Sequence, residues 1–357
     1  MSRSYDVAIV GAGMAGASLA AEIAGAASVL ILEAEARPGF HATGRSAAFW
    51  SETYGGPLIQ PLTSASRPAL TPFLSPRGAI HVADAAGREA LAALSDEFAG
   101  AEVALERLDR GALEARLPGL RPGWDEGLYE PSCADIDVAG LHAFYLAKAR
   151  RAGAVLATGA RVARIERAGS GWLIDGNREA RILVNAAGAW ADEVAALAGE
   201  APIGIAPHRR TIAQLRVDPP VPYDLPLVVD AAGRFYFKPE AGGRLWLSPH
   251  DETPSAACDC APEEIDVAIA IDRLERVVDW RIERVEHKWA GLRSFAPDRL
   301  PVYGYSGSGR GFFWCAGQGG FGIQTAPAAA ALAAGLLLGR PPGAIDPTPY
   351  LAARFEN

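Results

Sequence analysis

The sequence predicts a two-lobed α/β protein, with a parallel sheet and an antiparallel sheet built from interleaved segments. Short apolar runs such as 5–10, 28–33 and 311–316 show no alternation, which is typical of parallel strands covered on both faces. Residues 208–248 instead alternate between apolar and polar side chains, as antiparallel strands do. Segments of the first kind occur at the start, near 150–200 and at the end, so the chain visits one lobe several times.

Length, composition and charge exclude several classes of protein. The chain has 357 residues, enough for one large or two closely joined domains. It is 50% hydrophobic and 21% charged, which excludes a disordered chain. The net charge of −8 disfavours nucleic acid and anionic membranes as partners. The start lacks the regions of a signal peptide and the longest apolar run, 326–338, is too short to span a bilayer, so we expect a cytoplasmic protein.

The four cysteines do not have the spacing of a metal site. Cys258 and Cys260 are too close together to form a zinc pair without a second pair nearby, and Cys133 and Cys315 are isolated. We expect all four to be reduced, and no metal.

The first elements form a βαβ unit. A strand over 5–10 leads into Gly11, Gly13 and Gly16, a helix of small residues over 14–25 and a second strand over 28–33. In such a turn the first glycine permits a tight bend, the second lets the backbone approach a pyrophosphate, and the third lets helix and strand pack closely. The N–H groups at the helix start attract phosphates.

Glu33 ends the second strand, where a carboxylate can accept both hydroxyls of a ribose. The unit therefore predicts a dinucleotide site, and the same carboxylate would repel the 2′-phosphate of NADP.

The remaining elements follow in order along the chain. A loop over 37–46 leads to an expected helix start at Ser46. Further helices are expected over 85–98, 109–117, 135–152, 189–198 and 262–278, with an Ala- and Leu-rich helix after the Gly-rich turn 317–325. Further strands are expected over 78–82, 154–156, 161–167, 172–175, 181–188, 234–238, 244–247 and 311–316.

The interleaving also predicts the division into domains. A Rossmann-like nucleotide-binding domain takes residues 1–50, 135–203 and 286–357, and an antiparallel-sheet substrate domain takes 51–134 and 204–285.

Two features favour FAD over NAD as the dinucleotide. The expected helix start at Ser46 and the turn 317–325 each place a helix N-terminus near the cofactor. Reduced flavin carries negative charge at its N1–C2=O edge, which such a dipole stabilises.

The sequence resembles the D-amino acid oxidase/glycine oxidase superfamily of FAD enzymes, and most of all the bacterial D-arginine dehydrogenase type. The segments that carry the resemblance are 10–18, 37–48, 134–137, 183–190, 289–295 and 311–325, in family order. The resemblance implies a noncovalent FAD between two lobes, with the substrate on the face of the isoalloxazine ring beneath an antiparallel sheet. The cofactor-binding residues that it implies are Gly11, Gly13, Met14, Ala15, Gly16, Glu33, Ala34, Thr43, Gly44, Arg45, Ser46, Ala47, Ala48, Ser51, Val162, Ala187, Gly188, Trp190, Arg293, Gln318, Gly319, Gly320, Phe321, Gly322, Ile323 and Gln324.

The resemblance also implies the substrate site. Arg293 matches the family arginine that pairs with the substrate carboxylate, a task suited to a planar guanidinium. Tyr54 and Tyr236 resemble the tyrosines that bind the same carboxylate, and Arg210 resembles a substrate-side arginine. Gln318 lies in the turn expected at the flavin edge and the substrate pocket.

Two departures from the D-arginine dehydrogenase type bear on specificity. Ala79 stands where those relatives carry a glutamate for a cationic side chain, and Phe49 stands at their active-site histidine. Because an apolar wall cannot neutralise a buried guanidinium, we expect neutral, apolar or aromatic D-amino acids as substrates.

The expected reaction is oxidative deamination of a D-amino acid, by hydride transfer from Cα to flavin N5, giving an imino acid and then a 2-oxo acid and ammonia. A glycine- or sarcosine-type amine oxidase that uses oxygen is a second candidate. A non-catalytic flavin-binding subunit and an NAD-dependent dehydrogenase are the third and fourth. The sequence leaves open the electron acceptor, the oligomeric state and whether His41 contacts the flavin.

Overall fold

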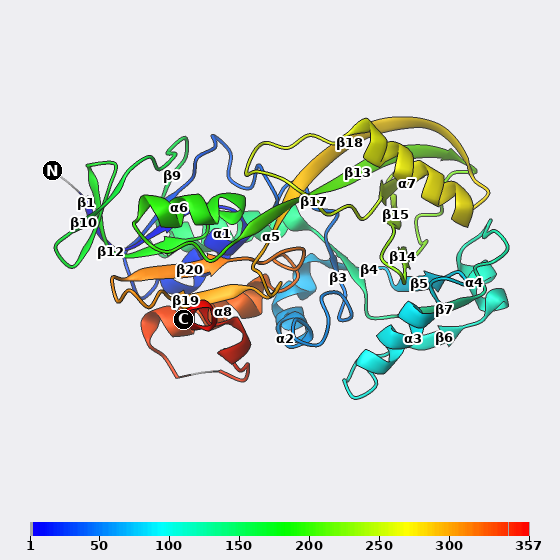
Figure 1. Ribbon diagram of the computed structural model, residues 1–357, viewed down its shortest axis with the longest axis horizontal. Coiled ribbons are helices and arrows are strands. Elements are labelled where there is room, and N and C mark those ends of the chain that lie inside the picture. Colours follow the sequence, from blue (N-terminus) through cyan, green and yellow to red (C-terminus); the bar gives the residue numbers. More distant parts are fainter. Residues whose placement is uncertain (1–2, 342, 357) are drawn as a thin grey trace.

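The computed structural model describes residues 3–341 and 343–356 and contains two large sheets and one small sheet. Figure 1 shows an elongated molecule, with the first sheet at the end that holds both termini and the second at the opposite end. The expected mixed α/β fold is confirmed.

The first sheet has eight strands in the order β10-β11-β12-β1-β2-β9, and β20 pairs with β12 and β19 with β20. Strands β1, β2, β9, β12 and β20 pair in parallel. The strands of this sheet are β1 (Arg3–Val10), β2 (Val29–Leu32), β9 (Val155–Ala157), β10 (Ile165–Ala168), β11 (Gly171–Ile174), β12 (Arg178–Asn185), β19 (Val302–Tyr305) and β20 (Phe312–Ala316).

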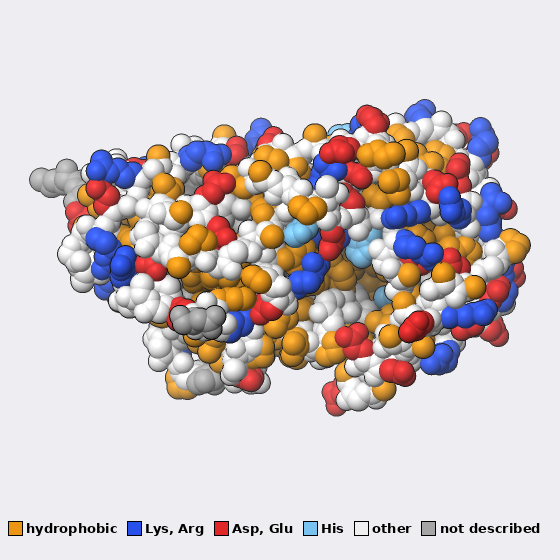
Figure 2. Space-filling view, viewed as in Figure 1, with side chains coloured by type: hydrophobic (Ala, Val, Ile, Leu, Met, Phe, Trp, Pro, Cys, Tyr) orange, Lys and Arg blue, Asp and Glu red, His pale blue; other side chains and the backbone are white. Residues whose placement is uncertain are grey.

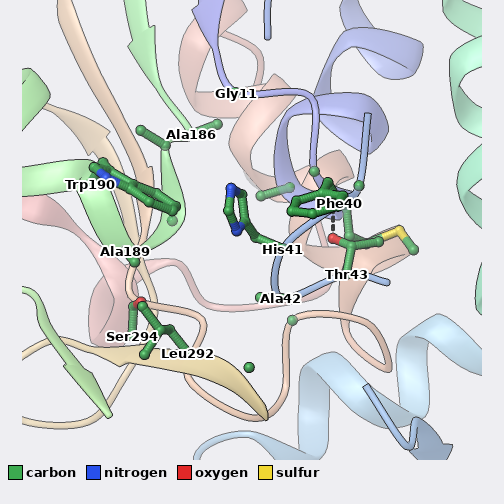
Figure 3. Close-up of a pocket in the computed structure, with 18 of the residues that line it drawn as sticks. Gly11, Phe40, His41, Ala42, Thr43, Ala186, Ala189, Trp190, Leu292 and Ser294 are labelled. Atoms are coloured by element: carbon green, nitrogen blue, oxygen red, sulfur yellow. Dashed lines mark hydrogen bonds between the residues drawn. The ribbon is translucent and has the colours of Figure 1, made fainter. Parts of the chain in front are cut away.

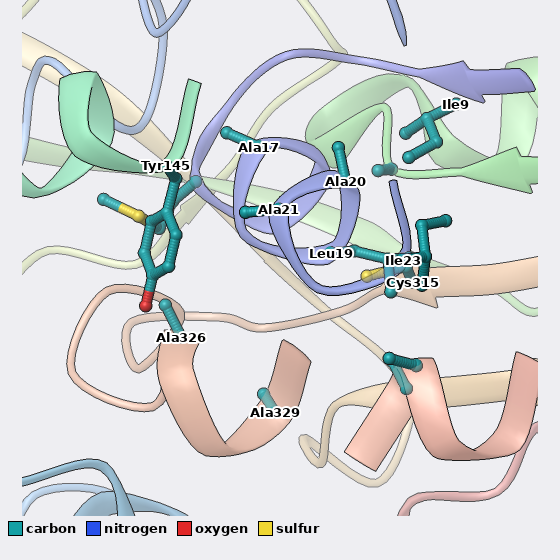
Figure 4. Close-up of a cluster of buried hydrophobic side chains, with 14 of the residues drawn as sticks. Ile9, Ala17, Leu19, Ala20, Ala21, Ile23, Tyr145, Cys315, Ala326 and Ala329 are labelled. Carbon is teal, nitrogen blue, oxygen red and sulfur yellow. The ribbon is translucent and has the colours of Figure 1, made fainter. Parts of the chain in front are cut away.

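Helix α1 (Met14–Ile23) lies in the main core of this part of the molecule, against α5 (Val138–Arg151) and α8 (Ala326–Leu338). Figure 4 shows Ala17, Ala20 and Ala21 of α1 in this core, with Ala21 toward Tyr145 of α5, and Ala326 and Ala329 of α8 close by. Small residues let the backbones approach closely, which fixes where the N-terminus of α1 points. Helix α6 (Ala191–Leu197) contributes to the separate core that contains Trp172 and Trp314.

The second sheet has nine strands in the order β17-β13-β16-β15-β14-β5-β7-β6, and β18 also pairs with β13. Its strands are β5 (Ala79–Ala83), β6 (Glu106–Leu108), β7 (Glu126–Glu130), β13 (Ala206–Asp218), β14 (Leu227–Asp230), β15 (Tyr236–Glu240), β16 (Arg244–Ser248), β17 (Thr253–Pro254) and β18 (Arg281–Phe295). The helices α3 (Arg88–Glu97), α4 (Arg110–Arg116) and α7 (Glu264–Val277) belong to the same part of the chain.

Strands β13 and β18 form a long antiparallel ribbon that carries the second sheet toward the first (Figure 1). The register is continuous from Ala206↔Phe295 to Gln214↔His287, and the irregularities lie beyond Gln214.

A small sheet of β3 (Phe49–Trp50), β8 (Ala134–Ile136) and β4 (Leu74–Pro76) lies where the chain crosses between the two large sheets. Asp135 of β8 accepts hydrogen bonds from Arg77 and from Lys238 of β15. These charge-assisted bonds tie the small sheet to the second large sheet.

The structure corrects one expected element and adds others. No helix begins at Ser46: residues 46–48 are irregular and lead into β3, because Phe49 and Trp50 pair with β8. The next helix is α2 (Gln60–Leu70), whose prolines and polar residues gave no clear pattern. The ribbon strand β18 is also far longer than the segment 289–295 that carried the resemblance.

Short 3-10 turns complete the chain over Thr71–Phe73, Gly188–Trp190, Thr348–Tyr350 and Ala352–Phe355. None of the helices within the described ranges is both long and apolar enough to cross a bilayer.

Candidate active site

A deep cavity runs from the N-terminus of α1 to the inner face of the second sheet. It encloses about 1780 Å³, open solvent at its mouth included. Figure 2 shows the surface hollowed near the middle of the molecule, with histidine side chains at the hollow and mixed charges around it.

Two of the glycines after β1 lie where any larger side chain would clash with the backbone. Gly11 has φ +104°, and a Cβ there would lie 2.3 Å from the carbonyl oxygen of Ala186. A Cβ on Gly16 would lie 2.0 Å from the carbonyl oxygen of Gly11. Gly11 and Gly16 therefore let α1 start directly against the strands, while Gly13 lines the cavity.

Glu33 presents a buried carboxylate to the cavity. Its Oε2 accepts from Ala12 N at 2.8 Å and its Oε1 from Glu35 N at 2.9 Å. A carboxylate has about four acceptor positions, so capacity remains for two ribose hydroxyls.

The loop after β2 folds over the start of α1. Thr43 Oγ1 accepts from Met14 N at 3.0 Å, a bond drawn in Figure 3. His41 points into the cavity from the same loop, its ring 4.7 Å from that of Trp190 and its Nε2 3.0 Å from Glu35 Oε1. His41 is thus a residue of the cavity wall.

Arg45 lines the cavity, but its guanidinium is bonded to protein groups. Nη1 donates to the carbonyl oxygens of Cys260 and Ala290, both at 3.1 Å, and Nη2 pairs with Asp259. Arg45 therefore links the loop after β2 to β18 and to the loop between β17 and α7.

The structure places most of the predicted cofactor residues on the cavity wall and a few behind it. Those on the wall are Gly11, Gly13, Met14, Ala15, Glu33, Ala34, Thr43, Arg45, Ser46, Ala47, Val162, Ala187, Gly188, Trp190, Arg293, Gln318, Gly319, Gly320, Gly322 and Ile323. Those behind it are Gly16, Gly44, Ala48, Ser51, Phe321 and Gln324. Gln324, for example, bonds to Tyr54 O and Thr63 Oγ1.

Sequence reasoning missed several wall residues, among them Phe40, Ala160, Glu193, Cys258, Cys260 and Leu292. Most of them lie in loops brought together only by the tertiary fold, so no local pattern marks them.

Arg210 of β13 and Arg293 of β18 reach the cavity from the same face of the ribbon. Arg293 is directly opposite His208, and Arg210 is opposite Gly291. Because opposed residues share a face and so do residues two apart on a strand, both guanidiniums point the same way. Gly291 has no side chain on this face, and a Cβ there would lie 3.2 Å from Arg45 Cβ.

Arg293 is the central cation of this end of the cavity. Its Nη1 donates to Tyr54 Oη at 2.5 Å, and within the described residues no carboxylate pairs with it. Burial lowers the pKa of Arg293, but Tyr54, Tyr236 and more distant carboxylates outweigh that effect and hold its pKa above the ordinary value. A charged guanidinium without an acidic partner is an anion-binding group.

Arg210 is more deeply buried and is partly satisfied by protein. Nε donates to Asp251 O at 2.6 Å and Nη2 to Glu252 Oε1 at 3.0 Å, while the buried Nη1 has no partner among the described residues. Burial, and then the charge of Arg293, lower the pKa of Arg210 to about 10. The guanidinium stays charged at neutral pH and has one free donor.

Ile212 and Tyr236 of the second sheet also line the cavity. Tyr236 packs with Ile212, Leu227, Val229 and Trp246. Phe49 lies against Tyr54 and Tyr236, with ring centroids 5.3 and 6.1 Å apart, and Ala79 is fully buried in the same cluster. Phe49 and Ala79 thus lie one layer behind the cavity wall, not on it as expected.

Two titratable residues near this end were not predicted. His250 has φ +57°, bonds through Nδ1 to Gly233 O at 2.7 Å and touches the Tyr236 ring. Glu130 is fully buried beneath the segment that carries Tyr54. Neither stands in a recognisable motif.

The fold and the cavity together are those of a nucleotide-dependent enzyme. The chain matches the sequence pattern of the FAD dependent oxidoreductase (DAO) family over residues 6–336, and it belongs to this family.

Relatives and solved structures agree with this assignment. A glycine oxidase from Pseudomonas aeruginosa is 30% identical over 258 residues, which are 67% of this chain and 65% of that protein. A crystal structure of glycine oxidase from Geobacillus kaustophilus superposes with a TM-score of 0.86 at 25% identity, covering 98% of this chain and 99% of that chain. An L-α-glycerophosphate oxidase from Mycoplasma pneumoniae with FAD bound has a TM-score of 0.85 at 16% identity, over 94% of this chain and 95% of that one.

The cofactor is therefore FAD. The residues present fit it, because Gly11 and Gly16 let α1 begin directly at the cavity, and Glu33 keeps acceptor capacity for ribose hydroxyls. The expected D-arginine dehydrogenase type is not confirmed by the comparisons.

Proposed function

We propose that this FAD-dependent oxidoreductase oxidises the C–N bond of an α-amino acid with a neutral side chain, as a D-amino acid dehydrogenase or oxidase. The observation that carries the proposal is Arg293, a charged guanidinium bonded to Tyr54 Oη and paired with no carboxylate of the described residues. An α-carboxylate is the anion of matching shape.

The second lobe supplies binding and orientation. Arg293 and Tyr54 hold one side of the carboxylate, and the free Nη1 of Arg210 is available on the other. The wall residues beside the two arginines, Ile212 and Tyr236, suit an apolar side chain and not a cationic one. FAD, when bound, supplies the two-electron acceptor for the Cα–H bond. Fixing the carboxylate aims that bond and excludes water around it.

A panel of substrates under anaerobic conditions tests the proposal. Bleaching of the flavin by D-alanine, D-leucine and D-phenylalanine, and weaker or no bleaching by D-arginine and the L-isomers, is the expected result. If D-arginine reduces the flavin fastest, the assignment of a neutral pocket is wrong. If no amino acid bleaches it, the protein is a flavin-binding subunit without this catalysis.

A glycine- or sarcosine-type oxidase is the second candidate, and the glycine oxidase likenesses favour it. The matched region spans 65% of the Pseudomonas enzyme, so its substrate is not transferred directly. Glycine and sarcosine in the same panel, with peroxide measured in air, separate the two candidates and identify oxygen or another compound as acceptor.

A further inference from the structure

Glu130 is a fully buried carboxylate beneath the segment that carries Tyr54. Its Oε2 accepts from Ser51 Oγ at 2.8 Å and from Thr53 Oγ1 at 2.7 Å, and its Oε1 accepts from Glu52 N at 2.7 Å. Three consecutive residues are therefore bonded to one side chain. A buried carboxylate is costly unless its oxygens are bonded in this way.

The position of Glu130 in the sheet makes this contact possible. Glu130 ends β7 directly opposite Ala79 of β5, whose methyl group leaves room beside it. His81 shares that face, with Nε2 3.7 Å from Glu130 Oε2 and 3.3 Å from Thr53 Oγ1. Burial raises the pKa of Glu130, but His81 and the two hydroxyl groups outweigh burial and hold it below the ordinary value.

The same segment is held from the other lobe by Gln324. Its Oε1 accepts from Ser51 N at 3.3 Å, and its Nε2 donates to Tyr54 O at 3.0 Å. Residues 51–54 are thus held by Glu130 on one side and by Gln324 on the other. The hydroxyl group of Tyr54, the last of these residues, accepts the hydrogen bond from Arg293.

We infer that Glu130 is a positioning residue for carboxylate recognition, which acts by holding residues 51–53 so that Tyr54 Oη stays on Arg293. This inference rests on the proposed function of Arg293. Neither Glu130 nor Tyr54 lines the cavity, whereas Arg293 does, so the effect of Glu130 on ligand binding passes through Tyr54 to Arg293.

A double-mutant cycle on the FAD-loaded protein tests the inference. The probe is benzoate, a carboxylate with an apolar ring and no amine, titrated by the visible absorbance of the flavin. Tyr54→Phe should weaken benzoate binding by about 3- to 10-fold, the worth of one hydrogen bond. Glu130→Ala should weaken benzoate binding by a similar factor. The double variant should bind benzoate no more than about 2-fold worse than whichever single variant has the lower affinity.

Two further variants separate charge from geometry and guard against misfolding. Glu130→Gln keeps groups that can bond Glu52 N and both hydroxyls, so it should bind within about 2-fold of the native protein. Thr53→Val removes one of the three bonds to Glu130, together with the contacts of Thr53 Oγ1 to Ser51 and His81. It should weaken binding less than Glu130→Ala, in the same direction. Glu126→Gln, an exposed carboxylate on the same strand, is the matched control.

Hydrogen exchange of the peptide over 49–56 gives a readout that does not depend on activity. Glu130→Ala should speed exchange there, and Glu126→Gln should not. Two outcomes would overturn the inference. In one, the losses of benzoate binding in the two single variants multiply in the double variant. In the other, Glu130→Ala leaves the exchange rate of this peptide unchanged. If Arg293→Ala binds benzoate as well as the native protein does, the proposed function itself fails, whatever Glu130 does.

Discussion

At the scale of single residues, the most direct prediction concerns the replacement of Arg293. Arg293→Ala should lower kcat/KM for the best amino acid by about 3 kcal/mol, roughly 100-fold, because the substrate carboxylate loses its charged partner. Stopped-flow reduction of the flavin measures this loss. Arg276→Ala, which removes a guanidinium from an exposed pair with Asp272 on α7, should leave the rate unchanged. Equal rates for the two variants would exclude Arg293 as the carboxylate ligand.

His250 predicts a dependence of stability on pH. Burial, and then Arg210 and Arg293, lower its pKa to about 3. Unfolded histidine titrates near pH 6.5. The neutral folded form therefore contributes stability that is complete above the unfolded pKa and is lost as pH falls toward the folded one.

Replacing His250 by asparagine, which tolerates the left-handed backbone at φ +57°, should remove this dependence. Between pH 7.5 and 5 the native protein should lose roughly 2 kcal/mol that the variant does not lose. Thermal unfolding of both proteins at the two pH values measures the difference. An identical fall in both melting temperatures would contradict a neutral buried His250.

At the scale of elements, the turn between β20 and α8 has no room for a side chain at Gly320. A Cβ there would lie 2.2 Å from Tyr54 Oη and 3.0 Å from Arg293 Nη1. Gly320→Ala should therefore displace the tyrosine and raise KM at least 10-fold while FAD is retained.

Gly335→Ala is the control for this turn variant. Gly335 lies inside α8, and an added Cβ would meet nothing within 4 Å. It should raise stability by about 1 kcal/mol, because alanine is the better helix former. Absorbance spectra for FAD content, melting temperatures and steady-state kinetics on both variants check the pair.

The elements also mark where sequence-based prediction works. The βαβ unit, α5, α7 and the strand before α8 were predicted because glycines, caps and apolar runs define them locally. The helix expected at Ser46 was wrong because pairing of Phe49 and Trp50 with β8 outweighs local preference. Glu130 and His250 could not be predicted, since their roles depend on neighbours 77 to 79 residues away and on the turn at Gly233.

At the scale of the whole molecule, Arg45 joins the two sheets around the cofactor cavity. Its guanidinium holds Asp259, Cys260 O and Ala290 O, and all three belong to the part of the chain around the second sheet. Arg45→Met keeps the length of the side chain and removes these bonds. We expect FAD to dissociate at least 10-fold faster, because three contacts to the guanidinium, two of them half-buried, are lost together.

Recovery of flavin fluorescence on dilution measures this dissociation. Arg37→Met, in the same loop, is the comparison for a loss of charge alone. Equal dissociation rates of FAD from the two variants would show that the bonds of Arg45 do not help to retain the cofactor.

The division into domains at residues 50, 135, 204 and 286 stays a prediction. Limited proteolysis with and without FAD, followed by mass spectrometry of the fragments, would locate the boundaries.

The ribbon of β13 and β18 has a consequence for changes in chain length. A one-residue insertion between Ala206 and Gln214, or in the opposing stretch 287–295, would rotate one guanidinium to the outer surface, since the side chains of a strand alternate. Beyond Gln214 the pairing is already interrupted by bulges, where an extra residue can be absorbed. Homologous chains can therefore lengthen the outer tip of this hairpin freely, whereas the portion that carries both arginines must keep its residue count.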